Sequence, residues 1–169
     1  MSIPYRKILV PLDGSEFALQ ALPHAEAIAR GLGAQLIVFE VVQDPTLLLG
    51  IASGVGMTGS GGGVGGGAIG VAPFPADAET HTKAMDEAKE ALDELVTSLR
   101  HRKINAVADI DAGNPAAKII DYATEHEIDL IVMSSHGRTG VQRWTYGSVA
   151  NKVLHAAPCA LLVVRPTLH

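Results

Sequence analysis

Short apolar runs alternate with longer amphipathic stretches along this chain of 169 residues. The runs are rich in β-branched residues and are four to eight residues long in their apolar part, which is typical of strands covered on both faces. One of them, Asn105 to Asp111, alternates apolar and polar residues, and we expect it nearer an edge of the sheet. The predicted strands are Lys7 to Asp13, Gln35 to Val42, Asn105 to Asp111, Ile128 to Met133 and Ala160 to Val164.

The stretches between these runs repeat apolar residues at helical spacing. A helix is predicted to begin after Ser15, which can cap it, and to end at Leu32, where Gly31 and Gly33 stop the pattern. Strands that alternate with helices form right-handed βαβ units. The sequence therefore predicts an α/β fold, a single domain with an open, mainly parallel, Rossmann-like five-stranded sheet and helices on both faces. The other helices are expected over residues 77–101, 114–127 and 148–157.

A Gly-rich insert at about 43–76 interrupts this alternation, with eleven glycines among residues 50–70. Within it, Gly65 to Gly70 fits the dinucleotide pattern G-x-G-x-x-G, but this segment neither follows a strand nor opens a helix. Such a composition produces the pattern readily by chance, so we give it little weight. The insert is either a mobile lid or a passive flexible loop, and we favour the passive loop.

Charge is distributed unevenly along the chain, whose formal net charge is −5. All eighteen acidic residues lie at or before Asp129, together with nine of the thirteen Lys and Arg residues. Residues 130–169 carry the other four cations and no acid. The overall negative charge argues against broad binding to nucleic acid or to an anionic membrane. The C-terminal part is therefore the place to look for a bound anion.

The sequence lacks the motifs that are typical of several functional classes. The single Cys159 cannot form an intramolecular disulfide and reads as a small buried hydrophobe. Neither a signal-peptide core nor a run of about 18 apolar residues occurs, so we expect a cytoplasmic protein. The histidines do not have zinc-site spacing, and no P-loop, G-x-S-x-G or nucleophile-with-base motif is found. We predict neither a catalytic residue nor a metal-binding side chain.

The segment from Ser134 to Ser148, SSHGRTGVQRWTYGS, follows a buried strand and leads into a helix. Free backbone N–H groups and the helix dipole favour an anion at such a position. Gly137 and Gly147 would allow close approach of the main chain and unusual φ angles, and Ser148 offers a hydroxyl and an amide. Taken together, these features predict a phosphate site, to which nearby cations contribute a positive potential: Arg138, Arg143 and Lys152.

This chain resembles the universal stress protein family, and specifically its ATP-binding branch, whose signature is Gly, two residues, Gly, nine residues, Gly, then Ser or Thr. The matching segments are SHGRTGVQRWTYGS, KILVPLDGSE and APCALLVVR, and the resemblance covers nearly the whole chain outside residues 43–76. Gly137, Gly147 and Ser148 occupy signature positions, whereas Ser134 stands where the family has its first glycine. A serine hydroxyl can itself donate a hydrogen bond to a phosphate.

The resemblance implies that the chain binds ATP, with Mg²⁺ as its counterion, and forms a homodimer. Asp13 would hold the adenosine part and Val41 would flank the adenine, while Gly137, Gly147 and Ser148 would hold phosphates. On residue type alone, Asp13 is about equally suited to a turn before the first helix. His136 is a candidate for contact with a phosphate or for proton transfer, although a single histidine in a loop is more often solvated. The other positions implied in nucleotide binding are Pro11, Gly113, Ser134, Arg138, Gly140 and Val149.

Three functions remain open. The first is an ATP-binding regulatory protein of the stress response with at most slow ATP hydrolysis. The second is a dimeric stress-signalling protein that acts through protein partners without nucleotide. In both cases we expect a homodimer formed through the last strand, ALLVV, which would otherwise be an apolar edge. The third is an adenylating enzyme or ATPase on a similar fold, although LDGSE lacks the glycine-rich run expected there after the first strand.

Overall fold

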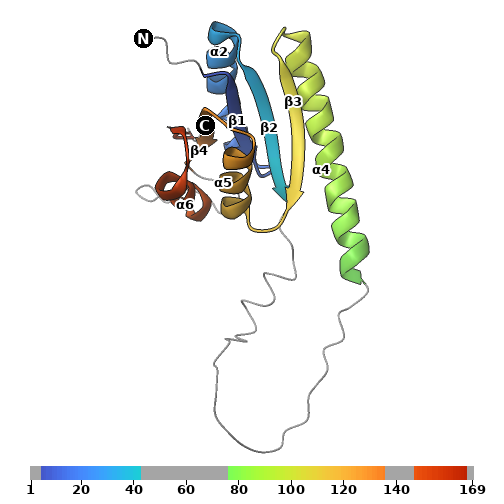
Figure 1. Cartoon of the computed structure of the whole chain (residues 1–169). Coiled ribbons are helices and arrows are strands. Elements are labelled where there is room, and N and C mark those ends of the chain that lie inside the picture. The colour runs from blue at the N-terminus through green and yellow to red at the C-terminus, as the bar shows by residue number, and fades with distance from the viewer. Residues whose placement is uncertain (1–4, 43–75, 136–146, 167–169) are drawn as a thin grey trace, which may run out of the picture.

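The computed structural model describes residues 5–42, 76–135 and 147–166 of the chain. Its strands form one five-stranded sheet in the order β3-β2-β1-β4-β5, and every neighbouring pair is parallel (Figure 1). Each strand lies within two residues of its predicted position, and the polar third strand is at an edge as predicted. The strands are β1 (Lys7–Leu12), β2 (Gln35–Val42), β3 (Ala106–Ala112), β4 (Leu130–Ser134) and β5 (Ala160–Val164).

Helices cover both faces of the sheet, as predicted. Buried side chains of α1, α2 and α4 pack with Ile8, Val10 and their neighbours on one face. Those of α5 and α6 pack with Leu9 and its neighbours on the other face. The middle of β1 is therefore completely buried, which explains its uninterrupted apolar sequence. The helices span Glu16–Leu19 (α1), Leu22–Leu32 (α2), Ala76–His101 (α4), Pro115–Glu125 (α5) and Ser148–Ala156 (α6).

The single helix predicted between Ser15 and Leu32 is wrong, because two helices, α1 and α2, occupy this segment. Pro23 lies in the first turn of α2 and has no N–H with which to continue α1. Its ring would also clash with the carbonyl of Leu19 if one helix ran through. The predicted ends are confirmed: the Ser15 hydroxyl accepts a hydrogen bond from the Ala18 amide, and Gly33 ends α2 with a left-handed φ of 66°.

An ion pair joins two helices on the same face of the sheet. Arg102, directly after α4, donates from Nη1 to both carboxylate oxygens of Glu26 in α2, at 2.9 and 2.8 Å. The Glu26 side chain is only 10% exposed, whereas that of Arg102 is 45% exposed. A carboxylate this deeply buried depends on its partner, since an unpaired buried charge is costly.

Replacement of Arg102 by alanine should therefore destabilise the fold by about 1–3 kcal/mol, because Glu26 would be left buried without its partner. The free energy of unfolding, measured by urea denaturation, tests this. Lys89→Ala is a matched control, because it removes a cation from the exposed face of α4, the helix that directly precedes Arg102. Equal stabilities of the two variants would contradict the structural role assigned to the ion pair.

Candidate functional site

The candidate site lies where the order of the strands reverses. β1 pairs with β2 on one side and with β4 on the other, so the chain returns across β1 between β3 and β4 (Figure 1). The segments after β1 and after β4 therefore leave the same edge of the sheet side by side. Ligands of open parallel sheets bind beyond this edge, because the crossover connections diverge there. The prediction that the segments after the first and fourth strands lie at one edge is confirmed, and binding at this edge stays a prediction.

The first wall of this site is the turn after β1. Oδ1 of Asp13 accepts hydrogen bonds from the Ser15 amide at 3.0 Å and from the Ser15 hydroxyl at 2.6 Å. The carboxylate thereby fixes the turn that starts α1, as its residue type suggested. Asp13 is half-buried, and Pro11 and Val41 are buried in the neighbouring strands. A contact between these residues and a nucleotide stays a prediction.

The second wall consists of Ser135, directly after β4, and Gly147, directly before α6, which together we call the closed neck. The Ser135 amide donates to the Val164 carbonyl at 2.8 Å, which extends the pairing of β4 and β5 by one residue. The Gly147 amide then donates to the Ser135 carbonyl, also at 2.8 Å. Ser135 and Gly147 are thus held together at the sheet edge. The sequence pattern does not single out Ser135, which is 2% exposed; its signal is only that it directly follows the buried run.

Helix α6 starts at this neck without a side-chain cap. Its N-cap is Gly147, which has no side chain to accept from the first amides, whereas Ser15 caps α1 and Asn114 caps α5. The expectation of an unusual φ at Gly147 is wrong, because its φ of −57° and ψ of 154° are open to any residue. Amides without a side-chain acceptor at a helix N-terminus favour an anion.

The turn between β3 and α5 forms a third wall beside Val41. Gly113 donates its N–H to the Val42 carbonyl at 3.0 Å and has a φ of +137°, which L-residues rarely adopt. A Cβ built on Gly113 would lie 3.3 Å from Cε of Lys118. Lys118 is held in this position by Asp111, with Nζ 3.0 Å from Oδ2. This turn therefore favours glycine for its backbone, and an added Cβ would also require the Lys118 side chain to shift slightly.

Of the remaining predicted site residues, three lie in the described part of the chain and four lie outside it. Ser134 is buried at the end of β4 and is not among the described residues with positive φ, so serine fits this backbone. Ser148 is exposed at the first turn of α6, and Val149 packs against the core beside it. The Gly-rich insert at about 43–76 lies almost entirely outside the described residues, as do His136, Gly137, Arg138 and Gly140.

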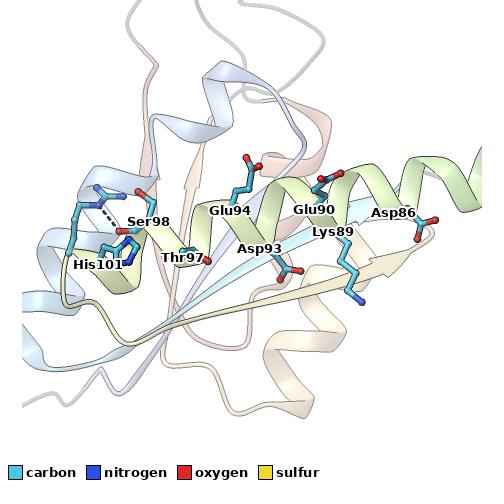
Figure 2. A pocket seen from close by; sticks show the side chains of 9 residues that line it. Asp86, Lys89, Glu90, Asp93, Glu94, Thr97, Ser98 and His101 are labelled. Carbon is cyan, nitrogen blue, oxygen red and sulfur yellow. Dashed lines mark hydrogen bonds between the residues drawn. The ribbon is translucent and has the colours of Figure 1, made fainter.

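A recess of about 770 Å³ lies along the polar face of α4, away from the reversal point (Figure 2). Its walls carry the carboxylates of Asp86, Glu90, Asp93 and Glu94, with cations only at Lys89 and Arg102. An acidic surface repels a polyphosphate. The recess is thus a poor site for the anion that the C-terminal part of the chain would attract.

One further observation concerns the helices, and another concerns the single cysteine. None of the described helices has the length and apolar character needed to cross a membrane. Burial raises the pKa of the Cys159 thiol, with a smaller contribution from Asp129. The thiol is therefore less reactive than a free cysteine, in agreement with its sequence context.

Comparison with known proteins identifies the family. The profile of the universal stress protein family matches residues 4–55 and 69–165. The chain belongs to the universal stress protein family. Universal stress protein MJ0577 of Methanocaldococcus jannaschii is 30% identical over 173 residues, which cover 98% of each chain. The solved structure of MJ0577 superposes with a TM-score of 0.76 over 98% of this chain and 99% of that one.

Other members of the family have been solved with nucleotides. A universal stress protein in complex with cAMP matches with a TM-score of 0.60 and 17% identity over 97% of this chain and 99% of that one. A family protein of Arabidopsis thaliana with AMP bound matches with a TM-score of 0.58 and 16% identity, covering 95% and 92%. These likenesses confirm the α/β fold of the family.

Replacement of Gly113 by alanine should destabilise the protein by about 1–3 kcal/mol, because the new Cβ meets Lys118 and the φ of +137° becomes strained. Gly31→Ala is a matched control: it lies in α2, and its Cβ would meet nothing within 4 Å. That change should stabilise by about 0.4–1 kcal/mol. Urea denaturation of both variants measures the difference, and effects of the same sign and size would disprove the strained turn.

Proposed function

We propose that this universal stress protein is a regulatory protein that binds ATP at the β1–β4 edge of its sheet. The observation that carries the proposal is the closed neck at Ser135 and Gly147, which leads directly into the uncapped start of α6. Such an arrangement presents backbone amides to a phosphate group at a fixed position. Family members solved with AMP and with cAMP support an adenine nucleotide as the ligand.

The charge pattern supports the same assignment. The segment between the two ends of the neck contributes Arg138 and Arg143 from the acid-free part of the chain, and α6 adds Lys152. On the other side of the reversal point, the half-buried Asp13 is suited to a ribose hydroxyl or to a water bound by magnesium. Direct contact of Asp13 with a polyphosphate would be repulsive. We therefore place the nucleoside beside β1 and the phosphates beside α6.

Magnesium would enter this site on the phosphates of the nucleotide, whose charge it would offset. Turnover of ATP is expected to be slow at most, because the described residues near the proposed phosphate position include no side chain placed as a general base. Efficient hydrolysis needs such a base within hydrogen-bond reach and with a suitable pKa. The protein would then act as a nucleotide-dependent regulator, with its signal passed to a protein partner.

Replacement of Gly147 by valine should weaken ATP binding at least about tenfold, or about 1.4 kcal/mol, because a β-branched side chain would occupy the space in front of the α6 amides. The backbone angles of Gly147 accept valine, so the fold should persist. Isothermal titration with ATP and magnesium measures the affinity. Gly31→Val in α2 is the control for the same change away from this edge.

Absence of binding by the wild-type protein would overturn the nucleotide proposal and would favour the reading in which the protein acts only through partners. Equal affinities of the wild type and the Gly147→Val variant would mean that a nucleotide binds, but not at the start of α6.

We further propose a homodimer formed by pairing of β5 with β5 of a second copy. β5 is an outer strand, and its residues Leu161 to Val163 are only half-buried although they are apolar. An apolar edge strand is a template for another strand. Leu162 packs against the core, whereas Val163 does not belong to either core cluster. Val163 is therefore the better position for a test that leaves the core intact.

Val163→Lys should weaken the dimer at least about tenfold, since the charge would be buried at the interface without a partner. Light scattering coupled to gel filtration, with a dilution series, gives the dissociation constant. Leu154→Lys, which changes a 44% exposed leucine on α6, is the control. A monomeric wild type, or an unchanged dissociation constant in Val163→Lys, would contradict assembly through β5.

A further inference from the structure

The two outer strands of the sheet, β3 and β5, differ in the hydrogen bonding of their edges. In a parallel strand, the N–H and C=O groups of alternate residues point to opposite sides. The Asn105 carbonyl accepts from Leu36 of β2, and the Gly113 amide donates to Val42 of β2. Odd-numbered residues of β3 therefore face β2, and the backbone groups of the even-numbered residues point outward from the sheet.

Side chains already form hydrogen bonds with several of these outward-pointing backbone groups. The Ile110 amide donates to Oδ1 of Asp109 at 2.9 Å, and the Ala112 amide donates to Oδ1 of Asp111 at 2.7 Å. At the other end of the strand, Nε of Arg100 donates to the Ala106 carbonyl at 2.9 Å. The groups that an added strand would bind are thus engaged at both ends of β3.

Helix α5 holds the two aspartates in place through their second oxygens. Oδ2 of Asp109 accepts from the Tyr122 hydroxyl at 3.0 Å, and Oδ2 of Asp111 lies 3.0 Å from Nζ of Lys118. The Tyr122 ring packs between Phe39 and His126, with centroid distances of 4.4 and 4.0 Å. Both carboxylates are therefore fixed from outside the strand as well as by its backbone.

The protonation states required for these contacts hold at neutral pH. Burial, and then the hydrogen bond to Asp109, raise the pKa of Tyr122, so its hydroxyl remains a donor. Burial raises the pKa of Asp111, but the hydrogen bonds from Lys118 and the Ala112 amide outweigh this effect, and the pKa lies below its ordinary value. Asp111 therefore remains charged.

The edge formed by β5 has no such protection in the described part of the chain. The Val164 carbonyl faces β4, where it accepts from Ser135, so the backbone groups of Leu161 and Val163 point outward. Among the described residues, no side chain forms a hydrogen bond with the backbone of Leu161 or Val163. The edge is also apolar, whereas two carboxylates lie along β3.

We propose that β3 is closed to strand addition by its own side chains, Asp109, Asp111 and Arg100, so that a second copy of the chain can extend the sheet only at β5. A protein with two accessible edges could form open-ended assemblies, because each added copy would present a new edge. Closure of one edge limits assembly to a pair. This inference concerns the opposite side of the molecule from the proposed dimer and does not depend on nucleotide binding.

The test is the double variant Asp109→Ala/Asp111→Ala, which frees the Ile110 and Ala112 amides. Its mass, from sedimentation velocity over a wide range of concentrations, should rise to at least twice that of the wild-type assembly. The variant Asp109→Asn/Asp111→Asn should keep the wild-type mass, because the asparagine oxygen still accepts from the amides. Asp86→Ala/Glu90→Ala on α4 makes the same charge change away from β3.

An alanine variant that stays folded by circular dichroism and keeps the wild-type mass would overturn the proposal. A rise in mass of the asparagine variant, or of the α4 control, would also overturn the proposal. The loss of negative charge, rather than the loss of the hydrogen bonds to the Ile110 and Ala112 amides, would then explain the assembly. Amide hydrogen exchange by NMR tests the wild type without any substitution. The Ile110 and Ala112 amides should exchange at least about tenfold more slowly than the outward amide of Ala108, and equal rates would refute the capping.

Discussion

The pairing of β1 with both β2 and β4 is the constraint on which the rest of the molecule depends. Asp129 secures it at the amino-terminal end, where its carboxylate accepts from the Arg6 and Lys7 amides at 2.8 and 2.9 Å and its own amide donates to the Lys7 carbonyl. Because β4 pairs with β1, the strands that follow β3 in the sequence lie on the opposite side of β1 from β2 and β3. The segments after β1 and β4 then diverge at one edge and leave room for a ligand.

Electrostatics divides this edge into two halves. The half next to β1 is shaped by a carboxylate, Asp13, which already serves its own turn. The half next to β4 leads into a helix start without a side-chain acceptor, in a part of the chain that contains no acid. A nucleotide has the matching polarity, with hydroxyls at one end and phosphates at the other. The acidic recess along α4 offers no such complementarity.

The sequence predicted those parts of the structure that depend on local pattern. Five buried or alternating runs identified the strands, and Ser15, Asn114 and Gly33 identified helix ends, because each acts through groups within a few residues. The break between α1 and α2 depends on how Pro23 competes with an otherwise helical pattern, which the spacing of apolar residues alone does not reveal. The predicted segments after the first and fourth strands do meet at one edge of the sheet, but the sequence pattern does not reveal the contacts of Ser135 or the Asp111–Lys118 pair, since these contacts join residues that only the folded sheet brings together.

The central claim is that the β1–β4 edge binds ATP, and an NMR titration of isotope-labelled protein with magnesium and ATP tests it most directly. Amide shifts should change after β1, at Asp13 to Ser15, and at the start of α6, at Gly147 to Val149. Amides along the α4 recess, from Asp86 to Arg102, should keep their shifts. Saturable changes confined to that recess, or no changes anywhere, would contradict the assignment of this edge as the nucleotide site.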